Sequence, residues 1–243
     1  MKKLMKAVAA LMLMTAVVGC TKPDEPNNGG NNGGDNDGTI NGHAYVDLGL
    51  PSGTLWATCN VGATIPEEYG NYFAWGETSP KTNYDWSTYK YCHYVDYIVH
   101  KLTKYCNKYT AGYEGFTDDL VVLQPDDDAA KVNWGDGWYI PTREQWDELY
   151  QTTNSTWTKR NDVNGVLFVA SNGKSVFMPA SGYYRGENNS SVGIFGYYWS
   201  GSLFIDNSRS GYCFTSQQYA DFGTSNCNYR CYGLPVRPVR SAE

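Results

Sequence analysis

The residues best suited to metal or redox chemistry in this 243-residue chain are its seven cysteines and three histidines. Cys227 and Cys231 are separated by three residues, a spacing that would suit a metal-binding or redox pair. A zinc site usually needs a second cysteine pair or two histidines as well, but the histidines all lie far upstream, at positions 43, 93 and 100. We therefore predict no metal centre and no catalysis by these cysteines.

Two other cysteines could form a disulfide. Cys92 and Cys106 lie in one tyrosine-rich insertion, residues 84–113, and could close a loop of about 15 residues, which would contribute about 3 kcal/mol by the chain-entropy model. The pairing of these two and of the three C-terminal cysteines stays open. Cys59 lies in an apolar stretch and is predicted to be a buried free thiol.

Carboxylates occur in two short runs, 118–119 and 126–128. Calcium takes six to eight oxygens from spaced positions, and neither run has the alternating Asp/Asn pattern of a calcium loop. We predict that run 126–128 is a solvated loop, and we leave calcium open as the one possible cofactor. No Ser-His-Asp order, phosphate-binding loop or HExxH motif is present in the sequence, so we predict that the protein is not an enzyme.

The segment between Gly201 and Gly233 has the composition of a binding surface. It contains no Lys, Glu, Met or Trp and is rich in Tyr, Ser, Asn and Gly. Tyrosine supplies rigid contact area, and the small polar residues supply adaptable hydrogen bonds. We predict that this segment captures a glycan or a protein, with a tyrosine-rich loop region that binds nothing as the alternative. Because side chains alternate along a strand, about half of the candidates are expected to point inward. The predicted ligand-binding residues are Phe204, Asp206, Asn207, Arg209, Tyr212, Gln217, Tyr219, Asp221, Asn226, Asn228, Tyr229, Arg230 and Tyr232.

The first twenty residues predict where the protein goes. Lysines at positions 2, 3 and 6 precede an apolar run, 7–18, which is too short to span a bilayer but suits a signal peptide. Residues 17–20 read VVGC, which resembles the lipobox of bacterial lipoproteins. The resemblance implies that residues 1–19 are removed and that Cys20 is lipidated and anchors the protein in a membrane. The alternative is an ordinary secretory signal that ends near a cysteine.

Residues 21–38 read TKPDEPNNGGNNGGDNDG and, with the lipidated Cys20, are predicted to form a flexible tether (20–38) with a reach of roughly 25 Å. Lys22, Asp24 and Glu25 resemble the surface-export signal of Bacteroides-type lipoproteins, which implies an outer-membrane protein that faces the exterior; an inward-facing periplasmic position is the alternative. Removal of the signal peptide removes three lysines and changes the net charge from −6 to −9. A negative net charge argues against a nucleic-acid partner.

Residues 39–243 are predicted to form one domain. An aromatic fraction of 15% and a charged fraction of 18% favour a loop-rich β or α+β domain over a helical bundle or a disordered chain. One helix is predicted, at 143–150: Thr142 and Gln145 form a capping box, and Trp146, Leu149 and Tyr150 share one face. Short strands are predicted at 43–48, 166–170, 175–179, 193–200, 212–215 and 236–239.

Six motifs of this domain resemble the Fibrobacter succinogenes major paralogous domain family, which is common in Bacteroides-type surface lipoproteins. They are VDLGLPSGTLWATCNVGA (46–63), YGNYFAWGE (69–77), WGDGWYIPTREQWDEL (134–149), FMPASGYY (177–184), YYWSGS (197–202) and YGLPVRPVR (232–240). The resemblance implies an α+β, C-type-lectin-like fold with few helices, irregular antiparallel sheets and long loops. This fold sometimes holds Ca²⁺. It is shared with formylglycine-generating oxidases and with the variable proteins of diversity-generating retroelements, and because a fold does not determine a function, each relative supplies a hypothesis.

Several residues of these motifs have predicted structural roles. The tryptophans at 56, 75, 134, 138 and 199 are predicted to be core residues. Arg237 and Arg240 are predicted to brace the last strand through carboxylates or carbonyls.

The residue types between Gly201 and Gly233 are compatible with diversification by a retroelement. Every residue of this segment except Gln217 and Gln218 has a codon that can be produced from an Asn-type codon by changing adenines. Adenine-directed mutagenesis would produce such a set of residues.

The sequence thus predicts a surface-anchored lipoprotein whose C-terminal segment binds a glycan or a protein. Two other function classes stay open. One is a structural subunit of a surface fibre or of an uptake complex. The other is a degenerate relative of the formylglycine-generating oxidases.

Overall fold

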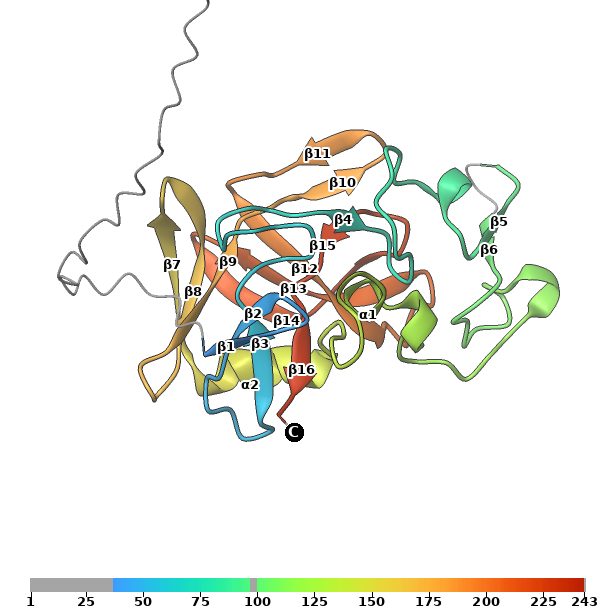
Figure 1. The fold of residues 1–243 in the computed structure, drawn as a ribbon. Coiled ribbons are helices and arrows are strands. Elements are labelled where there is room, and N and C mark those ends of the chain that lie inside the picture. Colours follow the sequence, from blue (N-terminus) through green and yellow to red (C-terminus); the bar gives the residue numbers. More distant parts are fainter. Residues whose placement is uncertain (1–36, 97–99, 243) are drawn as a thin grey trace, which may run out of the picture. The chain divides into compact units, whose positions relative to one another are not determined.

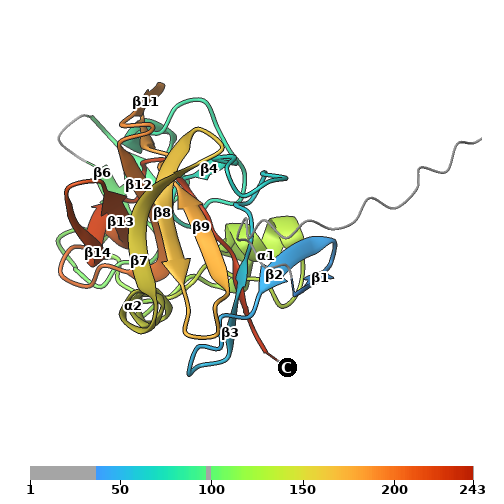
Figure 2. The same ribbon diagram turned by 90° about the vertical axis from the view of Figure 1, so that its left-hand side faces the viewer.

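A computed structural model of the chain describes residues 37–96 and 100–242, and Figures 1 and 2 show their fold from two sides. The signal peptide, the predicted lipidation site Cys20 and the tether before Asp37 lie outside the described residues. The first strand begins at Gly38, one residue before the predicted start of the domain. No helix in the described ranges is long and apolar enough to cross a membrane.

The two ends of the domain meet in one antiparallel sheet with the strand order β1-β2-β3-β16. Its strands are β1 (Gly38–Ile40), β2 (His43–Val46), β3 (Thr54–Ala57) and β16 (Val239–Ser241). Trp56 on β3 lies opposite Val46 of β2 and Val239 of β16, and all three side chains are buried. The predicted strand 43–48 is confirmed as far as Val46, whereas the predicted strand 236–239 is wrong except for its last residue.

Two further antiparallel sheets have three strands each. One consists of β7 (Asn154–Arg160), β8 (Val163–Val169) and β9 (Ser175–Pro179). The other consists of β12 (Phe195–Leu203), β13 (Ser210–Gln217) and β14 (Ala220–Tyr229). The predicted strands at 166–170, 175–179, 193–200 and 212–215 are confirmed within them, with bounds shifted by a few residues except for β9, where prediction and structure agree.

Helix α2 (Arg143–Thr152) confirms the helix predicted from the sequence and runs below the three-stranded sheets in Figure 2. Its capping box forms as expected, because the Gln145 amide oxygen accepts from the Thr142 N–H at 3.0 Å and the Thr142 hydroxyl accepts from the Gln145 N–H. The Trp146 ring stacks on Phe214 of β13 with ring centroids 4.8 Å apart and meets Trp56 edge-on, also at 4.8 Å. The helix is thus held by its buried aromatic face.

The structure corrects the interpretation of the acidic run 126–128. Asp127 ends the 3₁₀ helix η3 (Pro125–Asp127), and Asp128 is the N-cap of helix α1 (Ala129–Trp134), which the sequence analysis does not predict. Asp127 and Asp128 are 3% and 6% exposed, so the prediction of a solvated loop is wrong for both. Asp128 accepts from backbone N–H groups at the start of α1 and from the Ile140 N–H at 2.8 Å. A six-residue helix depends on such a cap, because its first N–H groups have no partner within the helix.

The remaining elements are short. Strand β4 (Tyr72–Phe73) pairs with β15 (Leu234–Pro235), β5 (Cys92–Tyr94) with β6 (His100–Leu102), and β10 (Tyr183–Arg185) with β11 (Asn188–Ser190). The insertion 84–113 begins with the 3₁₀ helix η1 (Trp86–Thr88) and leads into η2 (Tyr113–Gly115). The described residues are therefore mostly antiparallel sheet with two α-helices, an α+β arrangement, which is one of the two classes that the composition predicts.

The predicted core residues are confirmed. The five motif tryptophans are at most 7% exposed. Arg237 is completely buried; its Nε donates to the Asn60 amide oxygen at 2.8 Å, and its Nη1 donates to the carbonyl oxygens of Ala57 and Thr58. It therefore braces the last residues of the domain against β3, as expected.

The cysteines among the described residues are all free, so no disulfide closes the loop between Cys92 and Cys106. Cys106 is buried, and its Sγ donates to the Lys108 carbonyl oxygen. Cys59 is a free thiol as predicted, but it is only half-buried.

Candidate functional site

The structure divides the predicted ligand-binding residues among several environments. One cleft, which we call the aromatic cleft, is lined by Asn207, Arg209, Tyr229 and Tyr232. A second cleft, which we call the sheet-face cleft, is lined by Gln217, Asn226 and Asn228. The segment 201–233 therefore contributes to two concave surfaces rather than to one continuous surface.

Three of the predicted residues line neither cleft, because their side chains pack against other residues of the protein. The prediction for Arg230 is wrong, because its side chain is completely buried and donates to protein groups. The prediction for Tyr212 is also wrong: its ring is 9% exposed and is covered by the Arg143 guanidinium, 4.7 Å from the ring centroid. Phe204 packs edge-on against Tyr212 at 5.1 Å. Tyr212 lies on the same face of β13 as the buried Phe214, which packs on helix α2, and Arg230 lies in the tight turn that follows β14.

Of the remaining three predicted residues, two line neither of these clefts, and the side chain of the third is not among those that the structure describes. Asp206 and Tyr219 are exposed, Tyr219 at 91%, but neither lines a cleft. The side chain of Asp221 lies outside the described residues.

The aromatic cleft has a volume of about 820 Å³ and is built from three parts of the chain. The insertion contributes Tyr84, Trp86 and His100, and the β10–β11 hairpin contributes Arg185 and Asn188. The C-terminal segment contributes the four residues named above. In Figure 1 the hairpin lies at the top of the domain, with the start of the insertion beside it.

Backbone hydrogen bonds hold these three parts together. The N–H groups of Tyr84 and Gly186 each donate to the other's carbonyl oxygen at 2.8 Å, which joins the insertion to the hairpin. Tyr184 and Gly233 form a similar bridge, with distances of 2.8 and 3.0 Å, which joins the hairpin to the C-terminal segment. A Cβ atom at Gly233 would lie 2.7 Å from the Tyr84 ring, so this close approach requires glycine. The walls of the cleft are therefore fixed relative to one another.

The rings along the cleft form a connected series. Trp86 and His100 stack with centroids 4.5 Å apart and an interplanar angle of 14°. Tyr229 meets Trp86 at 6.1 Å and Tyr232 at 5.6 Å, both edge-on. Tyr232 in turn stacks on Tyr183 at 5.7 Å, and Tyr183 lines the sheet-face cleft. The Tyr183–Tyr232 pair thus has one cleft on each side.

Polar groups of the cleft lack partners within the described protein. The Arg209 Nε and the His100 Nδ1 are both buried and have no hydrogen-bond partner there. Burial lowers the pKa of His100, and the nearby Arg209 charge lowers it further, so the imidazole is neutral at pH 7. The Arg185 guanidinium lies 5.9 Å from the centroid of the Tyr232 ring. The lining of the cleft therefore combines aromatic faces with polar side chains that have unused hydrogen-bonding capacity.

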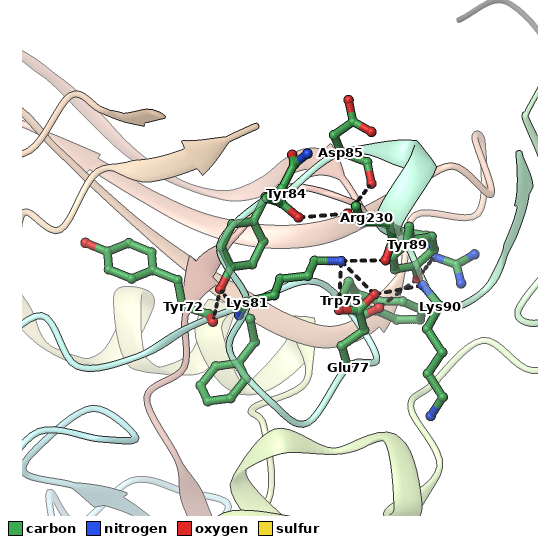
Figure 3. Close-up of polar contacts among 12 residues, drawn as sticks. Tyr72, Trp75, Glu77, Lys81, Tyr84, Asp85, Tyr89, Lys90 and Arg230 are labelled. Carbon is green, nitrogen blue, oxygen red and sulfur yellow. Dashed lines mark hydrogen bonds and ion pairs between the residues drawn. The ribbon is translucent and has the colours of Figure 1, made fainter. Parts of the chain in front are cut away.

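Arg230 lies between two cleft-lining residues in the sequence and ties the C-terminal segment to the insertion. Its Nε donates to the Tyr89 hydroxyl at 2.8 Å, its Nη1 to the carbonyl oxygens of Tyr105 and Ser208, both at 3.0 Å, and its Nη2 to that of Lys104 at 3.1 Å. Figure 3 shows its guanidinium beside the Tyr89 ring. Arg230 is therefore a positioning residue for the cleft and does not contact its interior.

A second set of polar contacts holds the Tyr84 side of the cleft (Figure 3). The Tyr84 hydroxyl donates to the Tyr72 carbonyl oxygen at 2.5 Å and accepts from the Lys81 N–H at 3.1 Å. The Lys81 ammonium pairs with Glu77 at 2.9 Å and donates to the Thr88 carbonyl oxygen in η1. Burial raises the pKa of Tyr84 to about 12, so its hydroxyl stays protonated and remains a donor at neutral pH.

The sheet-face cleft is smaller, about 410 Å³, and lies against β12, β13 and β14. Phe195 and Tyr197 of β12 face it together with Thr215 and Gln217 of β13, because alternate residues of a strand share one face. The Asn226 amide donates to the Thr215 hydroxyl at the edge of this cleft.

The groups in these clefts suit binding rather than covalent chemistry. Within the described part of the chain, no three His, Cys, Asp or Glu side chains lie close enough to hold a metal ion. Burial raises the pKa of the Cys231 thiol in the aromatic cleft and of the Cys227 thiol in the sheet-face cleft, so both are protonated at neutral pH and are poor nucleophiles.

Sequence reasoning missed Trp86, His100 and Arg185. The insertion that carries Trp86 and His100 has the same aromatic and polar composition as the C-terminal segment, so composition is the signal that could have found these two residues. Arg185 directly follows the motif FMPASGYY, and nothing in the sequence indicates that it faces Tyr232. No family model, curated protein or solved structure matches this chain.

Proposed function

We propose that this protein is a glycan-binding module that holds its ligand non-covalently in the aromatic cleft. The observation that carries the proposal is the arrangement of Trp86, Tyr229 and Tyr232 around a concave surface of about 820 Å³ with polar side chains between them.

The chemistry of sugars explains the match. A pyranose ring has an apolar C–H face, which packs on an aromatic ring, and a rim of hydroxyl groups, which need hydrogen-bond partners when they lose water. Asn188 and Asn207 offer both donors and acceptors at the cleft, and Arg185 and Arg209 offer further donors. The connected backbone of the walls reduces the entropy lost on binding.

We further propose that the domain has a C-type-lectin-like fold and that Cys20 anchors it to the outer face of the outer membrane. The pairing of β2 and β16 with the same strand, β3, supports the fold, since it brings both ends of the domain together in one sheet. The lipobox-like residues 17–20 and the Gly/Asn-rich residues that follow support the anchor.

The test is a glycan and mucin binding screen of the full-length protein in detergent micelles, with calcium and with a chelator. We expect binding that Trp86→Ala abolishes and that the chelator leaves unchanged. Tyr219→Ala is the matched control, because Tyr219 is an exposed tyrosine of the same segment that lines neither cleft. Absence of binding to any glycan, or equal binding by the Trp86→Ala variant, would refute the proposal.

A further inference from the structure

We infer that the glycan held in the aromatic cleft carries an acidic group, a carboxylate or a sulfate, and that Arg209 and Arg185 recognise it. This inference rests on the proposed function and adds to it the chemical class of the ligand. Three observations carry it: the two arginines have no carboxylate partner, the Nε of Arg209 is buried without a hydrogen-bond partner, and the lining of the cleft differs in charge from the protein as a whole.

The first observation concerns ion pairing. Most other cationic side chains outside the core are paired with a carboxylate, among them Lys81 with Glu77 at 2.9 Å and Lys104 with Asp127 at 2.6 Å. In the described ranges, neither Arg185 nor Arg209 lies within ion-pair distance of any carboxylate. Two unpaired guanidinium groups therefore line the same cleft.

The second observation concerns the setting of Arg209. Its carbonyl oxygen accepts from the Arg230 N–H at 3.0 Å, and its own N–H donates to the Asn207 side-chain oxygen at 3.1 Å, so its backbone is fixed. The Nε is nevertheless buried without a partner. A guanidinium pairs best with a planar or tetrahedral oxyanion, which accepts two parallel N–H bonds. The Arg209 guanidinium therefore lies at the cleft with hydrogen-bonding capacity that the protein does not use.

The third observation concerns charge. The chain carries 19 basic and 25 acidic residues, so its overall field repels anions. Asp85 is the one carboxylate among the residues that line the cleft, and its Oδ1 already accepts from the N–H and hydroxyl of Ser87. The two arginines therefore leave the cleft locally positive on an acidic protein, which would select an anion against the general repulsion.

The aromatic series limits the anion to one attached to a ring. Tyr232 lies under the Arg185 guanidinium and beside Tyr229, so an oxyanion bound at Arg185 would place the rest of its molecule on tyrosine rings. A uronic acid and a sulfated sugar both meet this description, whereas free phosphate or sulfate would leave the rings uncovered. Both sugars carry an oxyanion on the ring, and they differ in whether this group is a carboxylate or a sulfate.

The experiment measures binding of the full-length protein in detergent micelles to matched pairs of oligosaccharides. One pair is an oligogalacturonate and its methyl ester, which has the same rings without the charge. The other is a sulfated galactan oligomer and its desulfated form. We expect the charged member of at least one pair to bind at least tenfold more tightly, and this preference to weaken as NaCl is raised. Which pair shows the preference identifies the anionic group.

Two variants connect the preference to the cleft. Arg209→Gln is expected to remove most of the difference in affinity between the charged and the uncharged member of the pair. Arg185→Gln is the second variant if Arg209→Gln fails to fold, because the Arg185 side chain is exposed. Lys159→Gln is the control, because Lys159 is an exposed cation paired with Asp162 on the β7–β8 turn. Equal affinity for both members of each pair, or a preference that both arginine variants retain, overturns this inference alone. Binding of no member of either pair also overturns this inference, whereas the proposed function fails only if the glycan and mucin screen finds no ligand either.

Discussion

The Arg230 Nε donates to the Tyr89 hydroxyl at 2.8 Å, across 141 residues of sequence. Burial raises the pKa of Tyr89, so the hydroxyl keeps its own proton and donates it to the Trp75 carbonyl oxygen at 2.7 Å. The buried guanidinium is thereby compensated by neutral oxygens and aromatic faces rather than by a carboxylate. This bond joins the insertion, which forms one wall of the aromatic cleft, to the C-terminal segment, which forms another.

Replacing Arg230 by methionine should destabilise the whole domain. The variant leaves several buried carbonyl oxygens without donors, so we expect the free energy of unfolding, measured in urea, to fall by about 3 kcal/mol or more. Arg185→Met, at an exposed position of the β10–β11 hairpin, should change it by about 0.5 kcal/mol or less. An Arg230→Met protein with unchanged stability that had lost only ligand binding would show that Arg230 contacts the ligand after all.

Asp127 should make the protein sensitive to acid below pH 4. Burial alone raises the pKa of this carboxyl, but hydrogen bonds from Lys104, Tyr105 and Tyr91 outweigh it and lower the pKa to about 2. Because the folded-state value lies below the unfolded one, the stabilisation is complete above about pH 4 and is lost as the pH falls towards 2. Urea unfolding at several pH values should show this decline.

The decline should flatten in Asp127→Asn and persist in Asp119→Asn, since Asp119 is an exposed carboxylate of the same region. An unchanged slope in Asp127→Asn would contradict the assignment.

Asp128 should make the stability of the protein depend on pH with the opposite sign to Asp127 and at higher pH. Burial raises the pKa of its carboxyl to about 6, although backbone N–H groups of α1 and of Ile140 partly offset the effect. The folded state therefore binds a proton more tightly than the unfolded state does, so stability should fall as the pH rises from about 4 to about 6. Asp128→Asn keeps an oxygen for the cap and should remove this fall while lowering stability at acidic pH. A fall of the same size in the variant would rule out Asp128 as its source.

The thiols offer a test of the covalent structure. The six cysteines after Cys20 are all free, so unfolded protein without reductant should react with six equivalents of a thiol reagent at these positions. In the native protein Cys227 should react first, because it is the one exposed cysteine among the described residues. Fewer reactive thiols after unfolding would reveal a disulfide, and mapping by mass spectrometry would locate it.

The tyrosine ring itself, rather than its hydroxyl, should carry the contact at the rim of the aromatic cleft. Tyr229 is 46% exposed and meets two other rings of the cleft edge-on. Tyr229→Phe should therefore keep glycan affinity within about threefold, whereas Tyr229→Ala should weaken it by about tenfold or more, the size expected for one aromatic contact. Titration calorimetry of both variants would measure this. Equal losses in the two would assign the affinity to the hydroxyl.

Local patterns in the sequence were sufficient for several parts of this structure. The capping box of Thr142 and Gln145, the apolar face with Trp146, and the alternation in β9 depend on neighbours within a few residues, so their signals survive in a single sequence. Composition narrowed the fold class to a loop-rich β or α+β domain in the same way. The aromatic and polar bias of residues 201–233 predicts a binding surface, and side chains of this segment line both clefts.

The environment of each side chain was decided by contacts between distant segments. Arg230 and Tyr229 are adjacent in the sequence and equally plausible as ligand contacts, yet the fold buries one beneath Tyr89 and leaves the other at the cleft. Asp127 likewise belongs to an acidic run for which the sequence predicts a solvated loop, but the fold places Lys104 and Tyr105 within hydrogen-bond distance of its carboxylate. The sequence by itself determined the local elements and the composition of the binding segment. Only the tertiary structure decided which of its residues face a ligand, because burial and hydrogen-bond partners arise from chain segments far apart in sequence.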